Sequence, residues 1–454
     1  MSSSRSQRSS KSAHYPTLLL AFMRSAKYER RILMHNRWDF SLVFWIPLLV
    51  IFMVWWVFSR SQIVDLPIGV IDYDHGPVAS TLVRYLDASP DVSVAAQYGS
   101  PAEAKQAILA REIFGVVIIP PDFQRSILSA KPAPIVLQVN AQYGTHSGII
   151  QKGVQSVVGT VSAGTEMQRL VKQGTATSQV NAAYSPITIQ RVSLYNATTD
   201  YQLFLASTVL PAILHILAMI VGATTVGREL RDHKIDVWYH YIAQKTNILP
   251  SHYLQSRPDV TVAKTADLNI ADIDSGIPSP TNDVAINAAS LPLLIAGLNG
   301  KLIWPMLAYS LWAAVALTLA NEIHPVSFSA LALTYGCLLL LLMVSFWLGA
   351  IITLATFSLR VGLSATGFIS APSYAFAGVT FPYIAINDSA KYWTDTLPLT
   401  HYLKLHIAQL QMGAPVLISL PIVYGFIVAT LIMMLLTALL TKRALARPDR
   451  WGAR

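Results

Sequence analysis

The stretch VGLSATGFISAPSYAFAGVTFPYIAINDSAKYWTDTLPLTHYLKLHIAQLQM, Val361–Met412, decides how the rest of the chain is interpreted. It opens with an uncharged apolar run, Val361–Ile386, that is long enough to cross a hydrocarbon core about 30 Å thick. Gly378 and Pro382 interrupt this run, because proline removes a backbone donor and glycine favours other backbone angles. We therefore expect a transmembrane helix over 361–381 that breaks at these two residues.

Two short amphipathic segments follow, Asp388–Thr396 and Leu399–Gln411, with Pro398 between them. Each is too short to span a bilayer and is rich in apolar or aromatic residues. This is typical of segments that lie at the membrane–water boundary or re-enter the membrane under a cover of protein. We expect residues 382–412 to form a re-entrant or interfacial helical pair, in which Pro398 and the two break residues shape an outer gate. The alternative is an ordinary amphipathic loop.

The composition places the chain in a membrane. Of its 454 residues, 53% are hydrophobic and only 13% are charged, which is about half the usual charged share. Six long apolar runs contain no Asp, Glu, Lys or Arg. We therefore predict a polytopic α-helical membrane protein with six transmembrane helices, at 39–60, 201–227, 302–320, 326–359, 361–381 and 414–441.

The distribution of charge predicts the orientation. Of the net charge of +9, residues 1–41 carry +6 and residues 442–454 carry +4. Basic residues that flank the first and last spans follow the positive-inside rule, so both termini are expected in the cytoplasm. The same placement argues against nucleic acid as a partner. Residues 1–14 are predicted to be a disordered tail, and 15–38 an interfacial amphipathic helix on membrane lipid.

Residues 61–200 read as a soluble domain that faces outward. Short apolar strands such as PIGVIDYD and GVVIIPPDF alternate with helical patterns, which predicts an α/β extracytoplasmic domain between the first two spans. Asp72 and Asp74 could form a carboxylate pair or bind a metal. No partner acid or cluster of histidines has supporting spacing, so we interpret them as a solvated turn and expect no metal site.

The phrases FAGVTFPYIAI and LPLTHYLKL, together with IDYD and IPPDF in the outward domain, resemble ABC type-2 exporter permeases of the long-loop branch. The resemblance covers about residues 15–240 and 291–445. It implies a second permease copy, either identical or a close paralogue, and two ABC ATPase subunits that bind the ATP and Mg. A periplasmic adaptor is a further candidate partner. It also implies the inner membrane of a bacterium, with 61–200 in the periplasm.

The second span runs into TTVGRELRDHKIDVW, which would place Arg228, Glu229 and Arg231 at the cytoplasmic surface. By itself this pattern indicates only charges that anchor a helix end. The resemblance implies that these three residues meet the ATPase. The pattern departs from the family at His233 and Lys234, where the family usually has Gly-Thr.

Residues 228–301 are predicted to be a cytoplasmic coupling segment and loop, in which 241–290 is an insertion relative to the family. Family-like sequence resumes at LPLLIAGLNGKLIWP, so Gly300 and Lys301 are further candidates for coupling. This GLNGK segment lacks the spacing and the following Ser or Thr of a phosphate-binding loop. We therefore expect no ATPase activity and no cofactor in this chain.

The resemblance implies that substrate passes between two permeases, along the first, second and fifth spans. Candidate lining residues are Trp55, Trp56, His215 and Phe376. The tryptophans are equally typical of an interfacial belt. His215 is the one histidine within the apolar runs, which contain no Asp, Glu, Lys or Arg, and we interpret it as a neutral, hydrogen-bonded helix contact. This argues against an ion-driven antiporter, which needs intramembrane charges.

The function predicted is that of the permease subunit of an ATP-driven exporter for drug-like, lipidic or other hydrophobic or amphipathic molecules. Two alternatives stay open. The chain could be a membrane sensor or assembly anchor whose 61–200 domain binds a partner, or it could be a secondary transporter. The generic apolar spans do not specify the substrate.

Overall fold

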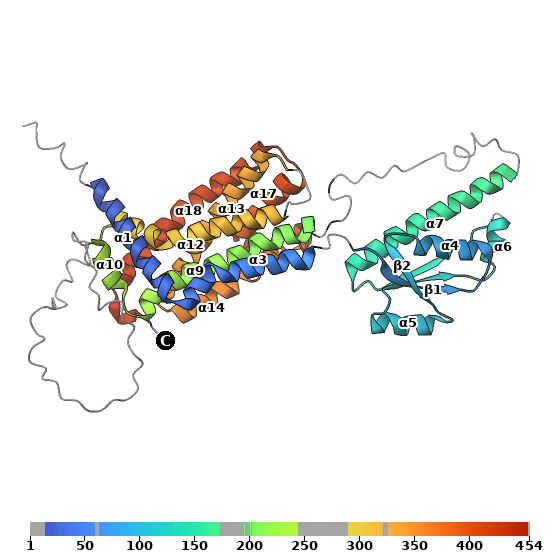
Figure 1. The fold of residues 1–454 in the computed structure, drawn as a ribbon, viewed down its shortest axis with the longest axis horizontal. Helices are drawn as coiled ribbons and strands as arrows, with labels where there is room; N and C mark the ends of the chain where they lie inside the picture. Colours follow the sequence, from blue (N-terminus) through green and yellow to red (C-terminus); the bar gives the residue numbers. More distant parts are fainter. Residues whose placement is uncertain are drawn as a thin grey trace, which may run out of the picture. The chain divides into compact units, whose positions relative to one another are not determined.

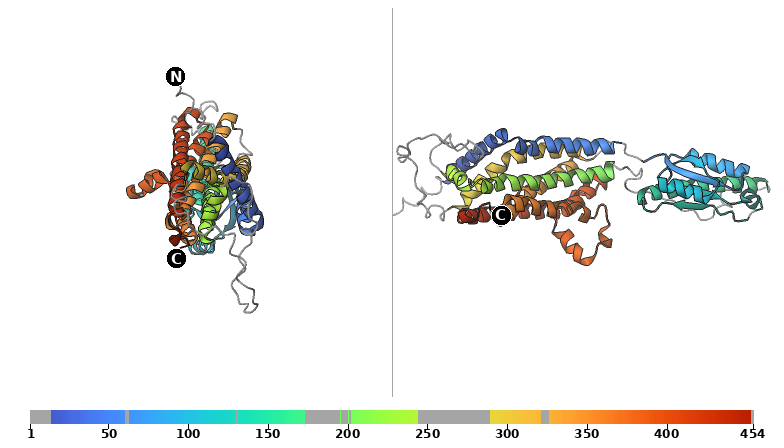
Figure 2. Two further views of the ribbon diagram at one scale, coloured as in Figure 1. Left: turned by 90° about the vertical axis from the view of Figure 1, so that its left-hand side faces the viewer. Right: turned by 90° about the horizontal axis from the view of Figure 1, so that it is seen from below.

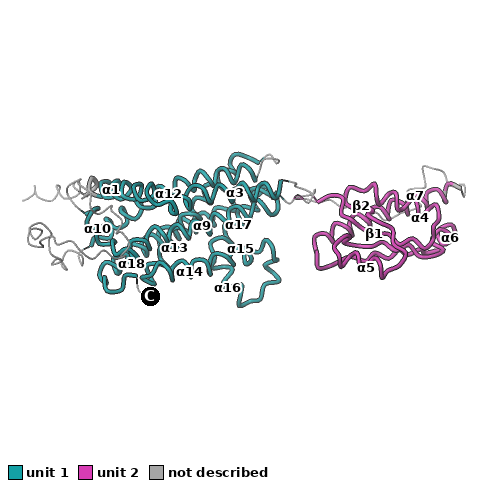
Figure 3. Tube along the Cα trace, turned by 60° about the horizontal axis from the view of Figure 1, so that its bottom comes forward, with its two compact units in different colours: residues 1–59, 202–454 teal, residues 60–201 magenta. Residues whose placement is uncertain are grey.

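The computed structural model of the chain describes residues 14–59, 63–129, 131–172, 195, 200, 202–243, 289–320 and 326–452. The predicted disordered tail, apart from residue 14, and nearly all of the 241–290 insertion lie outside the described residues. The chain divides into two compact units (Figure 3). Unit 1 comprises residues 1–59 and 202–454, and unit 2 comprises residues 60–201.

Unit 1 is a bundle of long helices with shorter helices at its ends (Figure 1). In chain order its elements are α1 (His14–His35), α2 (Arg37–Val43), α3 (Trp45–Phe58), η1 (Gln202–Ala206), α9 (Ser207–Arg231), α10 (Ile235–Ala243), α12 (Leu291–Ala320), α13 (Phe328–Thr356), α14 (Leu359–Ser370), α15 (Ser373–Phe376), η3 (Tyr383–Ala385), α16 (Asp388–Thr396), α17 (Pro398–His406), η4 (Ile407–Gln411), α18 (Val416–Leu445) and η5 (Pro448–Arg450).

Five helical stretches within the described ranges are long and apolar enough to cross a membrane. They are Arg37–Phe58, Gln202–Arg231, Leu291–Ala320, Phe328–Thr356 and Val416–Leu445. The protein is therefore a helical membrane protein with five candidate spans, where the sequence predicted six. The helix α12 begins at Leu291 rather than at 302, so Lys301 lies inside it and not at its start.

The missing span is the predicted helix over 361–381. Its helix, α14, has 12 residues and ends at Ser370. Pro372 follows two residues later, and a proline cannot continue the hydrogen-bond ladder of the preceding turn. A single turn, α15, comes next, and Gly378 then has a left-handed backbone with φ of +78°. The helix thus ends before the expected break at Gly378 and Pro382, and neither remaining piece is long enough to span.

Both segments predicted after the break are helices, and they are separated where expected. Pro398 occupies the first turn of α17, where its missing N–H would have no helical partner anyway. The helix α17 packs into the bundle, with Leu399, Tyr402 and Leu403 completely buried. By contrast, α16 projects from the side of the bundle (Figure 2), and its Tyr392 is 80% exposed.

The bundle is centred on the contact between α9 and α13. In the most apolar 18-residue segments of these two spans, 61% and 67% of the segment is buried, against 22% in the first and last spans. Glycines allow the close approach: a Cβ at Gly222 would overlap the carbonyl oxygen of Phe346, and one at Gly349 would overlap that of Met219. Small residues at crossing points are a common way for membrane helices to pack.

Unit 2 is a small mixed sheet covered by helices on both faces (Figure 1). Its elements are β1 (Leu66–Asp72), α4 (Pro77–Asp87), β2 (Val92–Gln97), α5 (Pro101–Ala110), β3 (Gly115–Ile119), α6 (Phe123–Leu128), β4 (Val136–Val139) and α7 (Gly144–Lys172). The strand order is β2-β1-β3-β4, in which β3 and β4 are antiparallel and the other pairs are parallel.

The central strand β1 explains this layering. Ile68 and Val70 face the core under α4 and α7, whereas Ile71 faces α5 on the other side. A strand with both faces covered is apolar almost throughout, as the sequence LPIGVID shows. Asp72, the last residue of the strand, supports a turn: its carboxylate accepts hydrogen bonds from the backbone N–H groups of Asp74 and His75, at 2.9 and 3.0 Å.

Candidate functional site

The site begins with an acid on the apolar face of α1. Ala21, Ser25, Glu29 and Leu33 follow one another at a spacing of four residues, which places them on one face of the helix. All four side chains are buried, and Glu29 has no exposed surface. A carboxylate in such a position is costly unless it is paired and hydrogen-bonded.

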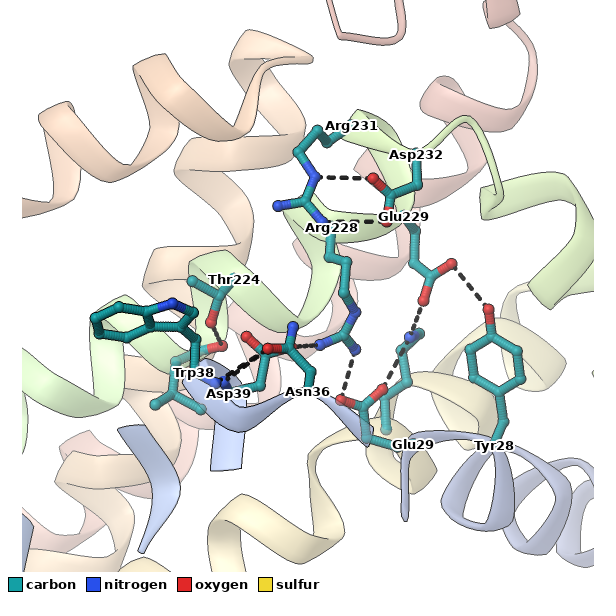
Figure 4. A network of polar contacts seen from close by, with 12 residues as sticks. Tyr28, Glu29, Asn36, Trp38, Asp39, Thr224, Arg228, Glu229, Arg231 and Asp232 are labelled. Atoms are coloured by element: carbon teal, nitrogen blue, oxygen red, sulfur yellow. Dashed lines mark hydrogen bonds and ion pairs between the residues drawn. The ribbon is translucent and has the colours of Figure 1, made fainter. Parts of the chain in front are cut away.

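Two cations from other helices pair with Glu29. The Nη2 of Arg228 in α9 lies 2.7 Å from one carboxylate oxygen, and the Nζ of Lys301 in α12 lies 3.1 Å from the other. Arg228 also pairs with Asp39, and Lys301 contacts Glu229 at 2.7 Å. We call these five residues, which join α1, α2, α9 and α12, the buried charge cluster; Figure 4 shows its contacts.

Neighbouring side chains hold the cluster in place. Asn36 caps α2 by accepting hydrogen bonds from the backbone N–H groups of Trp38 and Asp39, which fixes the start of that helix (Figure 4). The Tyr28 hydroxyl donates to Glu229 at 3.2 Å. The ammonium group of Lys301 lies 5.0 Å from the centre of the Tyr28 ring and 5.6 Å from that of Trp238.

The pairing determines the charge of Glu29. Burial by itself raises the pKa of this carboxyl group. The positive charges of Arg228 and Lys301, and their hydrogen bonds to it, outweigh burial and hold the pKa below its ordinary value of 4.5. Burial, together with the neighbouring Glu229 carboxylate, raises the pKa of Tyr28, which keeps that hydroxyl protonated as a donor.

This arrangement corrects our expectation for the coupling residues. Arg228, Glu229 and Lys301 are not at the surface; their exposed fractions are 7%, 2% and 1%. Gly300 is also internal, because a Cβ there would overlap the carbonyl oxygen of Phe22 in α1. Of the five candidates, only Arg231 is exposed, and it pairs with the adjacent Asp232 at 2.8 Å.

Sequence reasoning missed two of the three acids of the cluster, Glu29 and Asp39. They entered the sequence analysis only through the net charge of +6 over residues 1–41. One signal was present: Glu29 is the single acid in α1, and its spacing from Ala21 and Leu33 puts it on the apolar face. An acid on an apolar helical face needs a cation, and the isolated Lys301 next to an apolar run was the natural candidate.

An exposed turn leads away from the cluster. Arg231, Asp232 and His233 are exposed between α9 and α10, and His233 takes a left-handed φ of 52° that reverses the chain. The turn is supported from the C-terminal end, since the Trp451 ring lies 6.2 Å from that of His233. We call residues 231–234 the α9–α10 turn.

The four candidate pathway residues do not share one environment. Trp56 is 68% exposed on α3, Trp55 is half-buried, and Phe376 in α15 is half-buried. His215 is enclosed between α9 and α13, with its Nδ1 2.6 Å from the Ser345 hydroxyl oxygen. This agrees with the predicted hydrogen-bonded helix contact.

The comparison with protein families supplies the identity that geometry alone does not. A model described as ABC-2 family transporter protein matches residues 37–238. Over these residues, which make up less than half of the chain, the sequence matches that of an ABC-2 family transporter membrane protein. Searches of curated proteins and of solved structures gave no match.

The protein is therefore the membrane permease component of an ABC-2 type transporter, a family of permeases without ATPase activity of their own. The matched residues run from α2 to α10 and include unit 2 and three members of the charge cluster, Asp39, Arg228 and Glu229. The Val361–Met412 stretch lies outside the match. No group of three or more His, Cys, Asp or Glu side chains in the described part of the permease is placed to hold a metal.

Proposed function

We propose that this permease is the transmembrane subunit of an ATP-driven exporter, and that it moves hydrophobic or amphipathic molecules out of the cytoplasm or inner membrane between two permease copies. Two separate ATPase subunits would bind the ATP and Mg and supply the energy. The observation that carries the proposal is the buried charge cluster, because it ties an amphipathic helix, α1, to the C-terminal end of the membrane helix α9 and to the interior of α12.

Such a connection would let a permease transmit a displacement at the end of the bundle to its membrane-spanning helices. Interactions between buried, paired charges are strong and geometrically restrictive, so α1, α9 and α12 should move together at this point. The α9–α10 turn is the exposed part of the assembly and is the proposed contact with the ATPase. Arg228, Glu229, Gly300 and Lys301 would then transmit movement within the permease rather than touch the partner.

Charge reversal in the turn tests the contact. Arg231→Glu should lower the stimulation of ATPase activity by substrate and the recovery of the ATPase with the permease, while expression and membrane insertion stay unchanged. Arg125→Glu is the matched control, because it also removes an exposed arginine paired with a nearby aspartate, Asp122, at 3.2 Å. If Arg231→Glu gives the same ATPase stimulation and the same recovery of the ATPase as the control, the turn is not the contact.

Co-purification from the native host in mild detergent tests the assembly itself. A complex with an ATPase and two permease copies, with or without a periplasmic adaptor, is the expected result. Recovery of the permease alone, with no nucleotide-dependent change, would instead support a sensor or assembly anchor. Uptake driven by an ion gradient without ATP would support a secondary transporter.

The orientation is part of the proposal: both termini in the cytoplasm and residues 61–200 in the periplasm of a bacterial inner membrane. The charge distribution of the sequence supports it. A Ser89→Cys variant in a Cys337→Ser background should react with an impermeant thiol reagent in intact cells. Reaction only after the cells are broken would reverse the orientation.

A further inference from the structure

Unit 2 contains a cleft that the export mechanism does not use. It lies where α7 passes α4, α6 and the segment before β4, and its volume is about 520 Å³. Cavities that hold small molecules in proteins commonly measure about 300–1,000 Å³. The cleft is thus large enough for a ligand of that size.

Eight of the 13 residues that line the cleft are apolar. Among them, Leu82 and Phe123 are buried, at 1% and 5% exposure. Ile127, Val158 and Val161 pack against the same core but each keeps exposed surface toward the cleft. These apolar side chains are exposed in an open cleft. An apolar ligand that removes them from water therefore binds with a favourable free energy.

One part of the lining is charged. Glu166 and Arg169 form a bidentate ion pair on α7, with N–O distances of 2.6 and 2.8 Å. This pair uses two of the five guanidinium donors, so Arg169 can donate further hydrogen bonds. Lys131 adds an exposed ammonium group. With Glu166 neutralised by Arg169, the charged part of the lining carries an excess positive charge.

We propose that this cleft binds an elongated amphipathic molecule with an apolar body and a single anionic head group, such as a long-chain carboxylate or sulfonate. The apolar body lies along Phe123, Val158 and Val161, and the head group lies between Lys131 and Arg169. The site would give the permease a binding function in unit 2 that is separate from the passage through the spans.

The test uses the full-length permease in lipid nanodiscs, without nucleotide or ATPase, so its result does not depend on the proposed export. Dansyl-undecanoic acid is the probe, and its fluorescence is corrected with empty nanodiscs. Its uncharged methyl ester is the comparison ligand. Saturable binding of the acid that is tighter than that of the ester is expected.

Three variants locate the binding. Val161→Trp fills the cleft and should weaken binding of the acid by about tenfold or more, whereas Val171→Trp, at an exposed position of the same helix outside the cleft, should change nothing. Lys131→Glu should weaken binding of the acid by about tenfold and leave the ester unaffected. Thermal midpoints establish that each variant is folded. If Val161→Trp is not, the acid–ester difference in Lys131→Glu decides alone.

Unchanged affinity in folded Val161→Trp and Lys131→Glu variants would overturn the proposal. So would a covered cleft: in a Cys337→Ser background, a Val161→Cys variant should react with an impermeant maleimide. Protection from that reagent would mean that another part of the chain, such as residues 173–199, occupies the cleft. A disulfide between two copies would mean that a second permease covers it. Either result refutes ligand binding here while leaving the export proposal standing.

Discussion

The buried charge cluster predicts a large and specific cost for the variant Lys301→Met. The Lys301 side chain is 1% exposed and contacts two carboxylates, Glu29 at 3.1 Å and Glu229 at 2.7 Å. Methionine fills similar volume but removes the charge, which leaves the Tyr28 hydroxyl as the remaining hydrogen-bond donor drawn to the Glu229 carboxylate in Figure 4. Removing one partner of a buried ion pair typically costs about 3–5 kcal/mol. Because Glu29 keeps Arg228, we expect about 3 kcal/mol.

The free energy of unfolding in mixed micelles, titrated with a denaturing detergent, measures this cost. Lys391→Met is the matched control. It removes another lysine that lies 2.7 Å from a carboxylate, but its partner Asp388 is 93% exposed, and surface pairs contribute little. The double variant Lys301→Met/Glu229→Gln should cost less than the sum of its single variants by about 1–3 kcal/mol, because it also removes the orphaned carboxylate.

The reasoning fails if Lys301→Met is no more destabilising than Lys391→Met. It also fails if the costs of Lys301→Met and Glu229→Gln simply add, since residues in direct ionic contact must be coupled. In either case the ion pair between Lys301 and Glu229 would contribute no stability. The proposed rigid connection of α1 to α9 and α12 would then lose its physical basis.

Three further predictions concern pH and backbone packing. The Glu29 pKa is lowered in the folded protein, so its stabilising effect is fully present above 4.5 and is lost as the pH falls through the folded value; Glu29→Gln should reduce the fall in thermal midpoint that the wild type shows on acidification below 4.5, and an identical pH profile would contradict this. Gly349→Leu should lower the yield of monodisperse protein, since its side chain would overlap the Met219 carbonyl, whereas Gly336→Leu in the same helix has open space and should be tolerated. Gly378→Ala should destabilise the protein by about 1 kcal/mol through its left-handed φ, as measured by the same detergent titration, and an unchanged value would show that this backbone relaxes freely.

Several features of the protein follow from sequence alone. Long uncharged runs have few stable alternatives to membrane helices, so the membrane class and the positions of most spans could be predicted. The alternation of strands and helices in 61–200 predicted the α/β unit, because the covalent order β-α-β favours parallel pairing. The separation of the two segments at Pro398 was equally local, since a proline restricts its own φ and the residue before it.

Tertiary structure decided the rest. The helix α14 ends at Ser370, just before Pro372, and not at Gly378. Composition did not distinguish this 12-residue helix from a full span. The charge cluster joins residues from distant parts of the sequence, and Glu29 and Arg228 are 199 positions apart. From the sequence alone, charges beside apolar runs are interpreted as anchors at the membrane surface. Only the packing of α1 against α9 and α12 excludes water from them, and this burial turns separate surface charges into one paired, buried cluster.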